Sequence, residues 1–323
     1  MALPLAQADL LTIDALMAGI VEETVEEDAL LSNLPFETIS GYKQVSWNRE
    51  STLGAESQYI QPNEEIGESS PTFSNQTQTL SILADRVELD NFLVTTKDAV
   101  QSIEAAVIAS KGKQMMRKFH DTFYYGSTSS DANAFNGLHN IVSSSLTIEN
   151  GSSTTGAAGS LAELTQLLTT VKPGRADVII MNRNLHRRIS TPYISNVQFN
   201  IDHQTIGNLL TDYGEIPIMV TDYLKQTETL SGGSFASKTG GATGTIFAVK
   251  WGRSARSVPG ANGVYNNDGI LGIQAGPMQV GGPIELSDKL GFARKMSWYH
   301  TVIQGSTLSL AAYTGLTDAA FTV

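Results

Sequence analysis

The chain has 323 residues, of which 41% are hydrophobic and only 16% are charged, and it contains 29 glycines and no cysteine. Its formal net charge of −11 argues against tight, sequence-independent binding to nucleic acid, because such binding needs Lys and Arg to displace counterions from phosphates. The lack of cysteine excludes disulfides, thiolate metal sites and cysteine nucleophiles.

The N-terminal residues predict an amphipathic helix. Between residues 8 and 31, apolar side chains recur at helical spacing and the other face is acidic, so this helix must dock on another surface. The apolar positions are Leu10, Ile13, Met17, Ile20, Val21 and Val25. The stretch lacks the basic start of a signal peptide, and no window approaches the roughly eighteen apolar residues of a membrane helix, so we expect no membrane partner.

Two strand-like segments separated by a polar stretch predict a long β-hairpin over residues 44–90. Apolar and polar side chains alternate on both sides of the stretch, as is typical of strands. The distal part, residues 49–73, is acidic and has too little apolar surface to build a core. Because a lone hairpin is marginally stable in water, part of it must pair with the rest of the chain or with a neighbour.

Residues 96–125 predict the clearest helix of the chain. Apolar residues such as Val107, Met115 and Phe119 fall near one face. Acidic residues lie in the first half and basic residues in the second, an order that complements the helix macrodipole. A helix of this length would be a rod of roughly 45 Å, which suits a strut better than a compact domain.

An α/β body is predicted over residues 160–285, after a flexible Gly-Ser-rich boundary at 150–160. Ser160 and Glu163 have the spacing of a capping box that opens a helix. The expected elements that follow are a buried strand at 176–182, a helix at 182–190, and strands at 215–224 and 245–252. The C-terminal tail alternates like sheet again, and we expect it to return and pair near the strut.

No residue pattern predicts catalysis, a cofactor or a metal. No two of the five histidines have a metal-binding spacing. The Gly-Ser loop at 231–244 resembles a phosphate-binding loop, but Ser237 stands before Lys238 where that loop needs glycine. The paired carboxylates are adjacent residues, typical of a solvated face. We therefore expect no enzyme activity and assign no catalytic, cofactor-binding or metal-binding residues.

One local basic cluster has two explanations. Arg183, Arg187 and Arg188 accompany His186 in the predicted helix at 182–190. They could simply be cations that complement the helix dipole. They could also contact an acidic neighbour, such as another subunit.

Several runs of sequence, in this order, resemble the major capsid proteins of tailed bacteriophages, which have the Hong Kong 97-type fold. They are LPFETISG (34–41), FHDTFYYG (119–126) followed by FNGL (135–138), ADVIIMNRNLHRRI (176–189), YGEIPIMVTDYL (213–224) and IFAVKWG (246–252). The family order of parts is an N-terminal arm, an extended loop, a peripheral domain with a long spine helix, an axial α/β domain and a return to the peripheral domain. The correspondence covers nearly the whole chain.

The resemblance implies an α+β fold with defined parts. They are an N-terminal arm (1–43), an extended β-hairpin loop (44–90), a peripheral domain with the spine helix (91–150), an α/β axial domain (151–290) and return strands (291–323). The loop would lie across a neighbouring subunit, with interface residues Trp47, Arg49, Tyr59, Ile60 and Phe73.

The resemblance also implies the function. Copies of the chain, as hexamers and pentamers, would form an icosahedral shell around double-stranded DNA in the virion, assembled in the host cytoplasm. Scaffolding, portal and decoration proteins are further partners that the resemblance allows. Some members carry a scaffolding segment ahead of the arm; this sequence does not, so we expect that a separate scaffolding protein serves, that the chain has been trimmed, or that no scaffold is used. The initial Met1 favours an untrimmed chain. The type member joins a loop lysine to an asparagine, but no lysine occurs here between Lys43 and Lys97, so we expect no such crosslink.

Two alternatives remain open at the level of sequence. An encapsulin-type nanocompartment shell, which holds a cargo enzyme, shares the fold; the long extended loop favours the virus. A soluble enzyme with an unrecognised carboxylate site would form a small defined oligomer with a deep polar pocket instead of shells.

Overall fold

The computed structural model describes residues 29–39, 41–52, 59–62, 70–97, 103–151, 156–196, 212–228, 243–252 and 268–322. Residues 8–28 of the helix predicted at 8–31 therefore lie outside the described part of the chain. The described helices are α2 (Leu30–Asn33), α3 (Asn91–Lys97), α4 (Ile103–Tyr125), α5 (Leu138–Ile141), α6 (Leu161–Thr170) and α7 (Arg183–Asn196), with 3₁₀ turns at Ser144–Leu146 and Thr307–Ser309.

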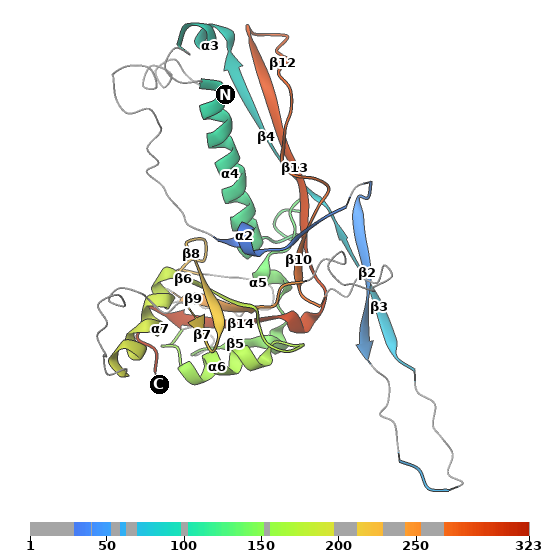
Figure 1. Cartoon of the computed structure of the whole chain (residues 1–323), viewed down its shortest axis with the longest axis vertical. Helices are drawn as coiled ribbons and strands as arrows, with labels where there is room; N and C mark the ends of the chain where they lie inside the picture. The colour runs from blue at the N-terminus through green and yellow to red at the C-terminus, as the bar shows by residue number, and fades with distance from the viewer. Residues whose placement is uncertain are drawn as a thin grey trace.

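A long helix and a long strand form an elongated unit that we call the spine (Figure 1). Helix α4 packs along one face of a sheet in which β13 is the central strand. This spine sheet consists of β1 (Phe36–Thr38), β4 (Ser81–Asp90), β10 (Ile270–Gln274), β11 (Gln279–Val280), β12 (Ile284–Glu285) and β13 (Gly291–Gln304). Fourteen residues at about 3.3 Å each make β13 roughly 45 Å long, which explains how one strand connects the far end of the spine with the rest of the molecule.

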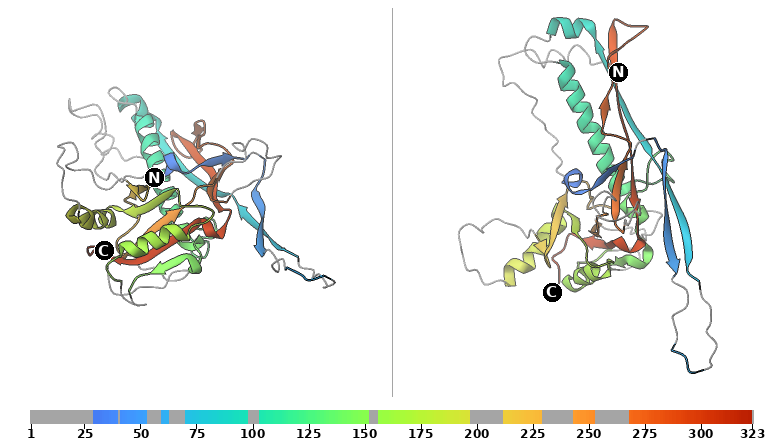
Figure 2. Two further views of the ribbon diagram at one scale, coloured as in Figure 1. Left: turned by 60° about the horizontal axis from the view of Figure 1, so that its bottom comes forward. Right: turned by 45° about the vertical axis from the view of Figure 1, so that its right-hand side comes forward.

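A second sheet, the body sheet, lies at one end of the spine (Figures 1 and 2). Its strand order is β5 (Thr147–Glu149), β14 (Leu310–Thr317), β9 (Thr243–Val249), β6 (Val178–Asn182), β8 (Ile216–Thr221) and β7 (Asp212–Tyr213). All residues of β6 and β9 are buried. Strands that are buried along their whole length occur where both faces of a sheet are covered.

Two apolar clusters flank the body sheet. On one face, Ile179, Ile246 and Tyr313 pack with Leu164 of α6 and Leu185 of α7. The other face belongs to a cluster that continues into the spine. Its members include Ile180, Phe247, Phe119, Phe123, Val87 and Trp298. The spine and the body therefore share one core.

The third sheet is the hairpin of β2 (Gln44–Thr52) and β3 (Thr72–Thr79), which projects away from the spine (Figure 2). Its antiparallel register runs from Gln44 opposite Thr79 to Thr52 opposite Thr72. Polar side chains pair across it, with Asn75 Nδ2 2.8 Å from Asn48 Oδ1. Because this hairpin has no apolar core of its own, its stability depends on contacts with the rest of the chain at its root.

The structure divides the chain differently from the predicted boundaries. Residues 81–90, predicted as part of the hairpin, are β4, which pairs with β13 in the spine sheet. Strands β10, β11 and β12 lie within the predicted axial range but also pair with β13, whereas residues 147–149, predicted as peripheral, pair with β14 in the body sheet. Alternation predicts that a segment is a strand, but the partner of a strand depends on residues far away in the sequence.

The described part of the predicted helix at 96–125 belongs to α3 and α4. Helix α3 ends at Lys97 and α4 begins at Ile103, and residues 98–102 lie outside the described part of the chain. The shorter α4 has 23 residues and is roughly 35 Å long. Helix α6 begins where the capping signal places it, and Ser160 Oγ accepts from Ala162 N at 3.2 Å.

Candidate functional site: surfaces for subunit contact

The root of the hairpin is fastened to its own subunit. Trp47 is partly buried and packs with Val45 and Leu80 against the small cluster of Leu271, Ile273 and Ile303. Arg49 donates from Nε to the carbonyl oxygen of Gly305 and from Nη2 to that of Gln304, each at 2.9 Å. Partial burial lowers the pKa of Arg49. Two of the five residues predicted for the subunit interface thus have contacts within the chain.

The other three residues predicted for the interface are exposed. Tyr59 is fully exposed, and the exposed fractions of Ile60 and Phe73 are 43% and 67%. Phe73 lies on β3 of the hairpin that projects away from the spine (Figure 2), and Tyr59 and Ile60 lie in the segment that connects β2 with β3. Large apolar side chains in such a position have a driving force to be covered by another surface.

The basic cluster of α7 has acidic partners within the chain. Arg183 Nε lies 3.4 Å from Asp222 Oδ1. Arg188 Nε and Arg187 Nη2 lie 2.8 and 3.5 Å from Asp318 Oδ1. The hydrogen bond from Arg188 is the main reason that the pKa of Asp318 is lowered. Intramolecular pairing therefore accounts for these arginines, and a contact with another subunit stays a prediction.

A buried polar cluster, which no sequence pattern predicts, joins the end of α4 to the body sheet. Glu228 is buried and accepts hydrogen bonds from Tyr125 Oη and Thr245 Oγ1, both at 2.6 Å. His139 Nε2 lies 3.3 Å from the same carboxylate, and its ring stacks on Tyr125 at 4.6 Å between centroids. Burial, and then the charge of Glu228, raises the pKa of Tyr125 far above its usual range. The cluster fixes the spine helix relative to the body.

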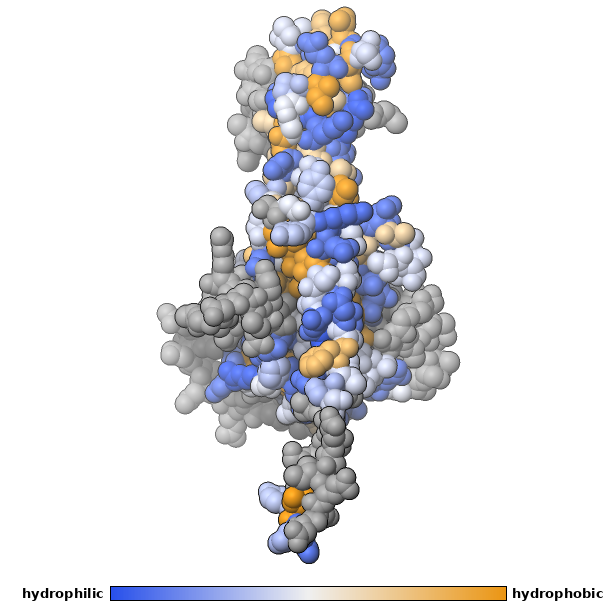
Figure 3. All heavy atoms as spheres, turned by 90° about the vertical axis from the view of Figure 1, so that its right-hand side faces the viewer, coloured by the Kyte–Doolittle hydropathy of each residue, from blue (hydrophilic) through white to orange (hydrophobic). Residues whose placement is uncertain are grey.

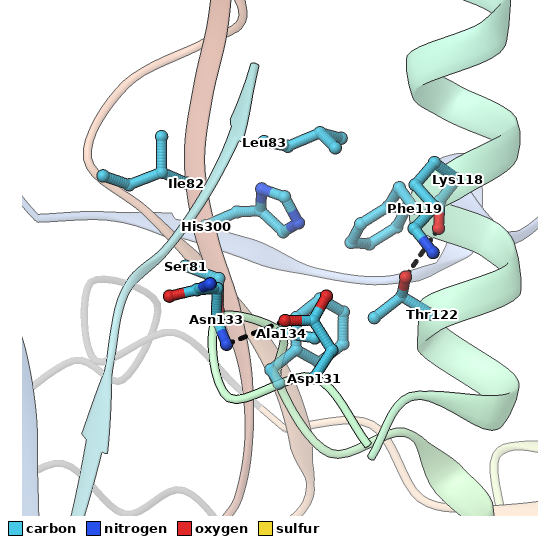
Figure 4. A pocket seen from close by; sticks show the side chains of 11 residues that line it. Ser81, Ile82, Leu83, Lys118, Phe119, Thr122, Asp131, Asn133, Ala134 and His300 are labelled. Carbon is cyan, nitrogen blue, oxygen red and sulfur yellow. Dashed lines mark hydrogen bonds between the residues drawn. The ribbon is translucent and has the colours of Figure 1, made fainter. Parts of the chain in front are cut away.

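A small cavity lies between the start of β4 and the second half of α4 (Figure 4). Its volume is about 90 Å³, below the roughly 300 Å³ of typical ligand pockets. His300 lines it, stacked on Trp298 at 4.1 Å and edge-on to Phe119 at 5.0 Å. Burial lowers the pKa of His300 to about 4, so the ring is neutral at pH 7 and packs as an aromatic side chain.

The described residues were also compared with the requirements of a metal site and of a membrane-spanning helix. No group of three or more His, Asp or Glu side chains there is arranged to hold a metal ion. None of the helices in the described ranges has both the length and the apolar character needed to cross a membrane.

Solved structures share this fold. The holo-SrpI encapsulin complex from Synechococcus elongatus PCC 7942 matches with a TM-score of 0.68 at 11% identity, covering 100% of this chain and 99% of that one. A structure of Microbacterium phage Oxtober96 matches at 0.63 and 12% identity, with 98% of each chain covered. The capsid of Myoviridae phage XM1 matches at 0.61 and 12% identity, covering 98% of this chain and 99% of that one. The predicted α+β, Hong Kong 97-type fold is thereby confirmed.

Comparison of the sequence itself identifies the family. Among curated proteins no sequence matches this chain. The family model for the SU10 major capsid protein, however, matches residues 13–240, which is more than half of the chain. That range includes the hairpin, α4 and a large part of the body. The chain therefore belongs to the SU10 major capsid protein family, and the predicted resemblance to major capsid proteins of tailed bacteriophages is confirmed.

Proposed function

We propose that copies of this chain assemble through hexamers and pentamers into an icosahedral shell that encloses double-stranded DNA. Membership of a major capsid protein family and the shared capsid fold support this proposal. Scaffolding and portal proteins would take part in assembly in the host cytoplasm, and the chain would have no catalytic activity. The net charge of −11 suits a wall that surrounds DNA without binding it tightly.

The observation that carries the proposal is the contrast between the two ends of the hairpin. The root is held by Trp47 and Arg49, so the hairpin is part of the folded subunit. The distal part exposes Tyr59, Ile60 and Phe73 away from that subunit. A hairpin that is fixed at one end and exposes large apolar side chains at the other is suited to covering a second copy. Because each subunit in a shell has several neighbours, modest contacts of this kind add up to a stable assembly.

Deletion of residues 52–70 tests this role. We expect a folded subunit that fails to form stable shells, as judged by circular dichroism and by electron microscopy of the particles. The double variant Y59A/I60A should weaken assembly in the same direction, whereas Y42A, which removes an exposed aromatic side chain outside the distal part, should assemble normally. Normal shells from the deletion variant would remove the hairpin from its proposed role.

An encapsulin-type shell is the second candidate, because the SrpI encapsulin complex has the same fold with a TM-score of 0.68. The family match favours the viral shell. Particles purified from the native host distinguish the two candidates: nuclease-protected double-stranded DNA supports the capsid, and a co-purifying cargo enzyme supports the nanocompartment. Genes for a terminase and a portal beside this gene would point in the same direction as packaged DNA.

A further inference from the structure

Three buried polar side-chain atoms beneath the root of the hairpin have no hydrogen-bond partner among the described residues. They are Glu37 Oε2 on β1, Trp47 Nε1 on β2 and Thr301 Oγ1 on β13. Apart from nitrogens of histidine rings, they are the only such side-chain atoms in the ranges that the structure describes. Because buried polar groups are paired in nearly all folded proteins, three unpaired ones at one place need a physical explanation.

Glu37 and Thr301 point to the same face of the spine sheet. Glu37 is opposite Ile273 in the register of β1 with β10, and Ile273 is opposite Thr301 in the register of β10 with β13. Neighbouring strands are about 4.8 Å apart, so Glu37 and Thr301 flank Ile273 on its two sides. Their sequence neighbours Phe36 and Val302 pack into the core beneath α4. Since side chains alternate along a strand, Glu37 and Thr301 point the other way, towards the hairpin.

Trp47 covers this row of side chains. Its indole packs on the cluster that contains Ile273 and Ile303. Thr301 is completely buried, and the unpaired atoms of Glu37 and Trp47 are shut off from solvent although both side chains are partly exposed. Figure 3 shows the molecule from the side on which the hairpin lies, where hydrophilic side chains run down the middle of the face. A molecule that reaches the three atoms must therefore be small enough to be enclosed under the hairpin root.

The chemistry of the three groups identifies this molecule. The indole N–H can only donate a hydrogen bond, a carboxylate can only accept, and a hydroxyl can do both. A cation cannot accept from Trp47, and an anion cannot approach the carboxylate of Glu37. A neutral molecule that both donates and accepts satisfies all three groups, and water is the smallest one. Buried waters typically make about three hydrogen bonds to polar groups that would otherwise be unsatisfied.

We propose that a single water molecule is bound between Glu37, Trp47 and Thr301 and joins the hairpin root to the spine sheet. The water accepts from Trp47 Nε1, donates to Glu37 Oε2 and makes its third hydrogen bond with Thr301 Oγ1. It thereby links three strands that are far apart in the sequence, β1, β2 and β13. The site lies within one subunit, so it does not depend on the proposed function.

A density map of the full-length chain, from crystals or from assembled particles, tests the site directly at a resolution that shows ordered water. We expect a peak within about 2.7–3.2 Å of all three atoms. A map with no peak at this place would overturn the proposal. So would a peak within about 2.6 Å of the Glu37 oxygen with the indole N–H turned away, because that geometry belongs to a bound cation.

The variant T301V gives a second test, in which the sign of the effect separates a bridged hydroxyl from an unpaired one. The substitution replaces the hydroxyl by a methyl group of similar size. If a water bridges Thr301, loss of one net hydrogen bond should raise the equilibrium constant of unfolding about two- to tenfold. If the hydroxyl has no partner, its removal should leave that constant unchanged or lower it, and this result would overturn the proposal.

A double-mutant cycle separates the shared water from the loss of packing. W47F removes the indole N–H, so W47F/T301V should unfold less readily than the product of the two single effects predicts. The matched control is W298F, because Trp298 lies on the same strand as Thr301 but faces the core beneath α4 and donates to Gln274 Oε1 at 3.1 Å. The effects of W298F and T301V should multiply. Effects of W47F and T301V that also multiply would contradict a water shared by Trp47 and Thr301.

Discussion

Arg49 of β2 and Gly305, just beyond the end of β13, are joined by a hydrogen bond of 2.9 Å from the guanidinium Nε to the carbonyl oxygen. A second bond of the same length goes to Gln304. The two atoms of one rigid group thus hold two successive carbonyls, which fixes the direction in which the hairpin leaves the subunit. Arg49 is partly buried, so the two carbonyl groups that it binds are partly screened from water.

Replacing Arg49 by Lys should loosen the hairpin, since an ammonium group cannot reproduce the planar two-donor geometry. We expect a loss of about 1.5–3 kcal/mol in the free energy of unfolding, the usual range for hydrogen bonds to charged groups, and faster proteolysis within the hairpin. The matched control is R175K, because Arg175 pairs with Glu215 at the surface, where exposed ion pairs contribute about 0–1 kcal/mol. Equal effects of the two substitutions would contradict the anchoring role.

The buried carboxylate of Glu228 should make Tyr125 important for stability. In Y125F, Glu228 Oε1 loses a 2.6 Å hydrogen bond, and Lys225 N loses its 2.8 Å acceptor. Leaving the buried Glu228 oxygen unsatisfied costs about 1–3 kcal/mol, whereas the exposed Lys225 N can bond water, so chemical denaturation should show a clear loss. Y213F, which removes a hydroxyl that bonds exposed Thr165, should change stability by less than about 0.5 kcal/mol. A Y125F variant as stable as wild type would rule out this role for the cluster.

His300 should make stability depend on pH. Its folded pKa of about 4 is below the ordinary value of 6.5, so the unfolded chain binds the proton more readily between these values. The stabilisation is complete above pH 6.5 and falls as the pH drops towards 4, by at most about 3 kcal/mol at about 1.4 kcal/mol per pKa unit. Unfolding of H300F, measured at pH 7 and pH 4.5, should show a smaller difference between the two conditions than wild type. An unchanged difference would assign the pH dependence to other groups.

Assembled particles should contain no lysine-mediated covalent links between hairpins. The segment between Lys43 and Lys97 has no lysine, so the distal hairpin carries no amine to form an isopeptide bond. Particles boiled in SDS without any crosslinker should therefore run as monomers. A ladder of covalent oligomers on that gel would show that a different chemistry joins the subunits.

Local patterns predicted the elements whose residues interact with close neighbours in sequence. Continuous apolar residues identified the buried strand β6, and the Ser160 cap identified the start of α6. The capping box was only half correct, however. Glu163 receives the hydroxyl of Tyr313, and the same hydroxyl accepts from Ser160 N at 3.0 Å. The hydroxyl of Tyr313 on β14 thus links Ser160 N to the Glu163 carboxylate, in place of the direct bond that a capping box would have.

The sequence by itself determined the acidic charge, the freedom from cysteine, the type of most elements and the family, because these depend on composition and on spacings of a few residues. The tertiary structure alone decided which strands pair with β13, that Arg49 and Trp47 hold the hairpin root, and that Asp318 receives Arg187 and Arg188. It also placed Glu228 beneath Tyr125 and brought Arg86 beside Lys295. These partners are far apart in sequence, and only the packing of the whole chain brings their side chains within contact distance.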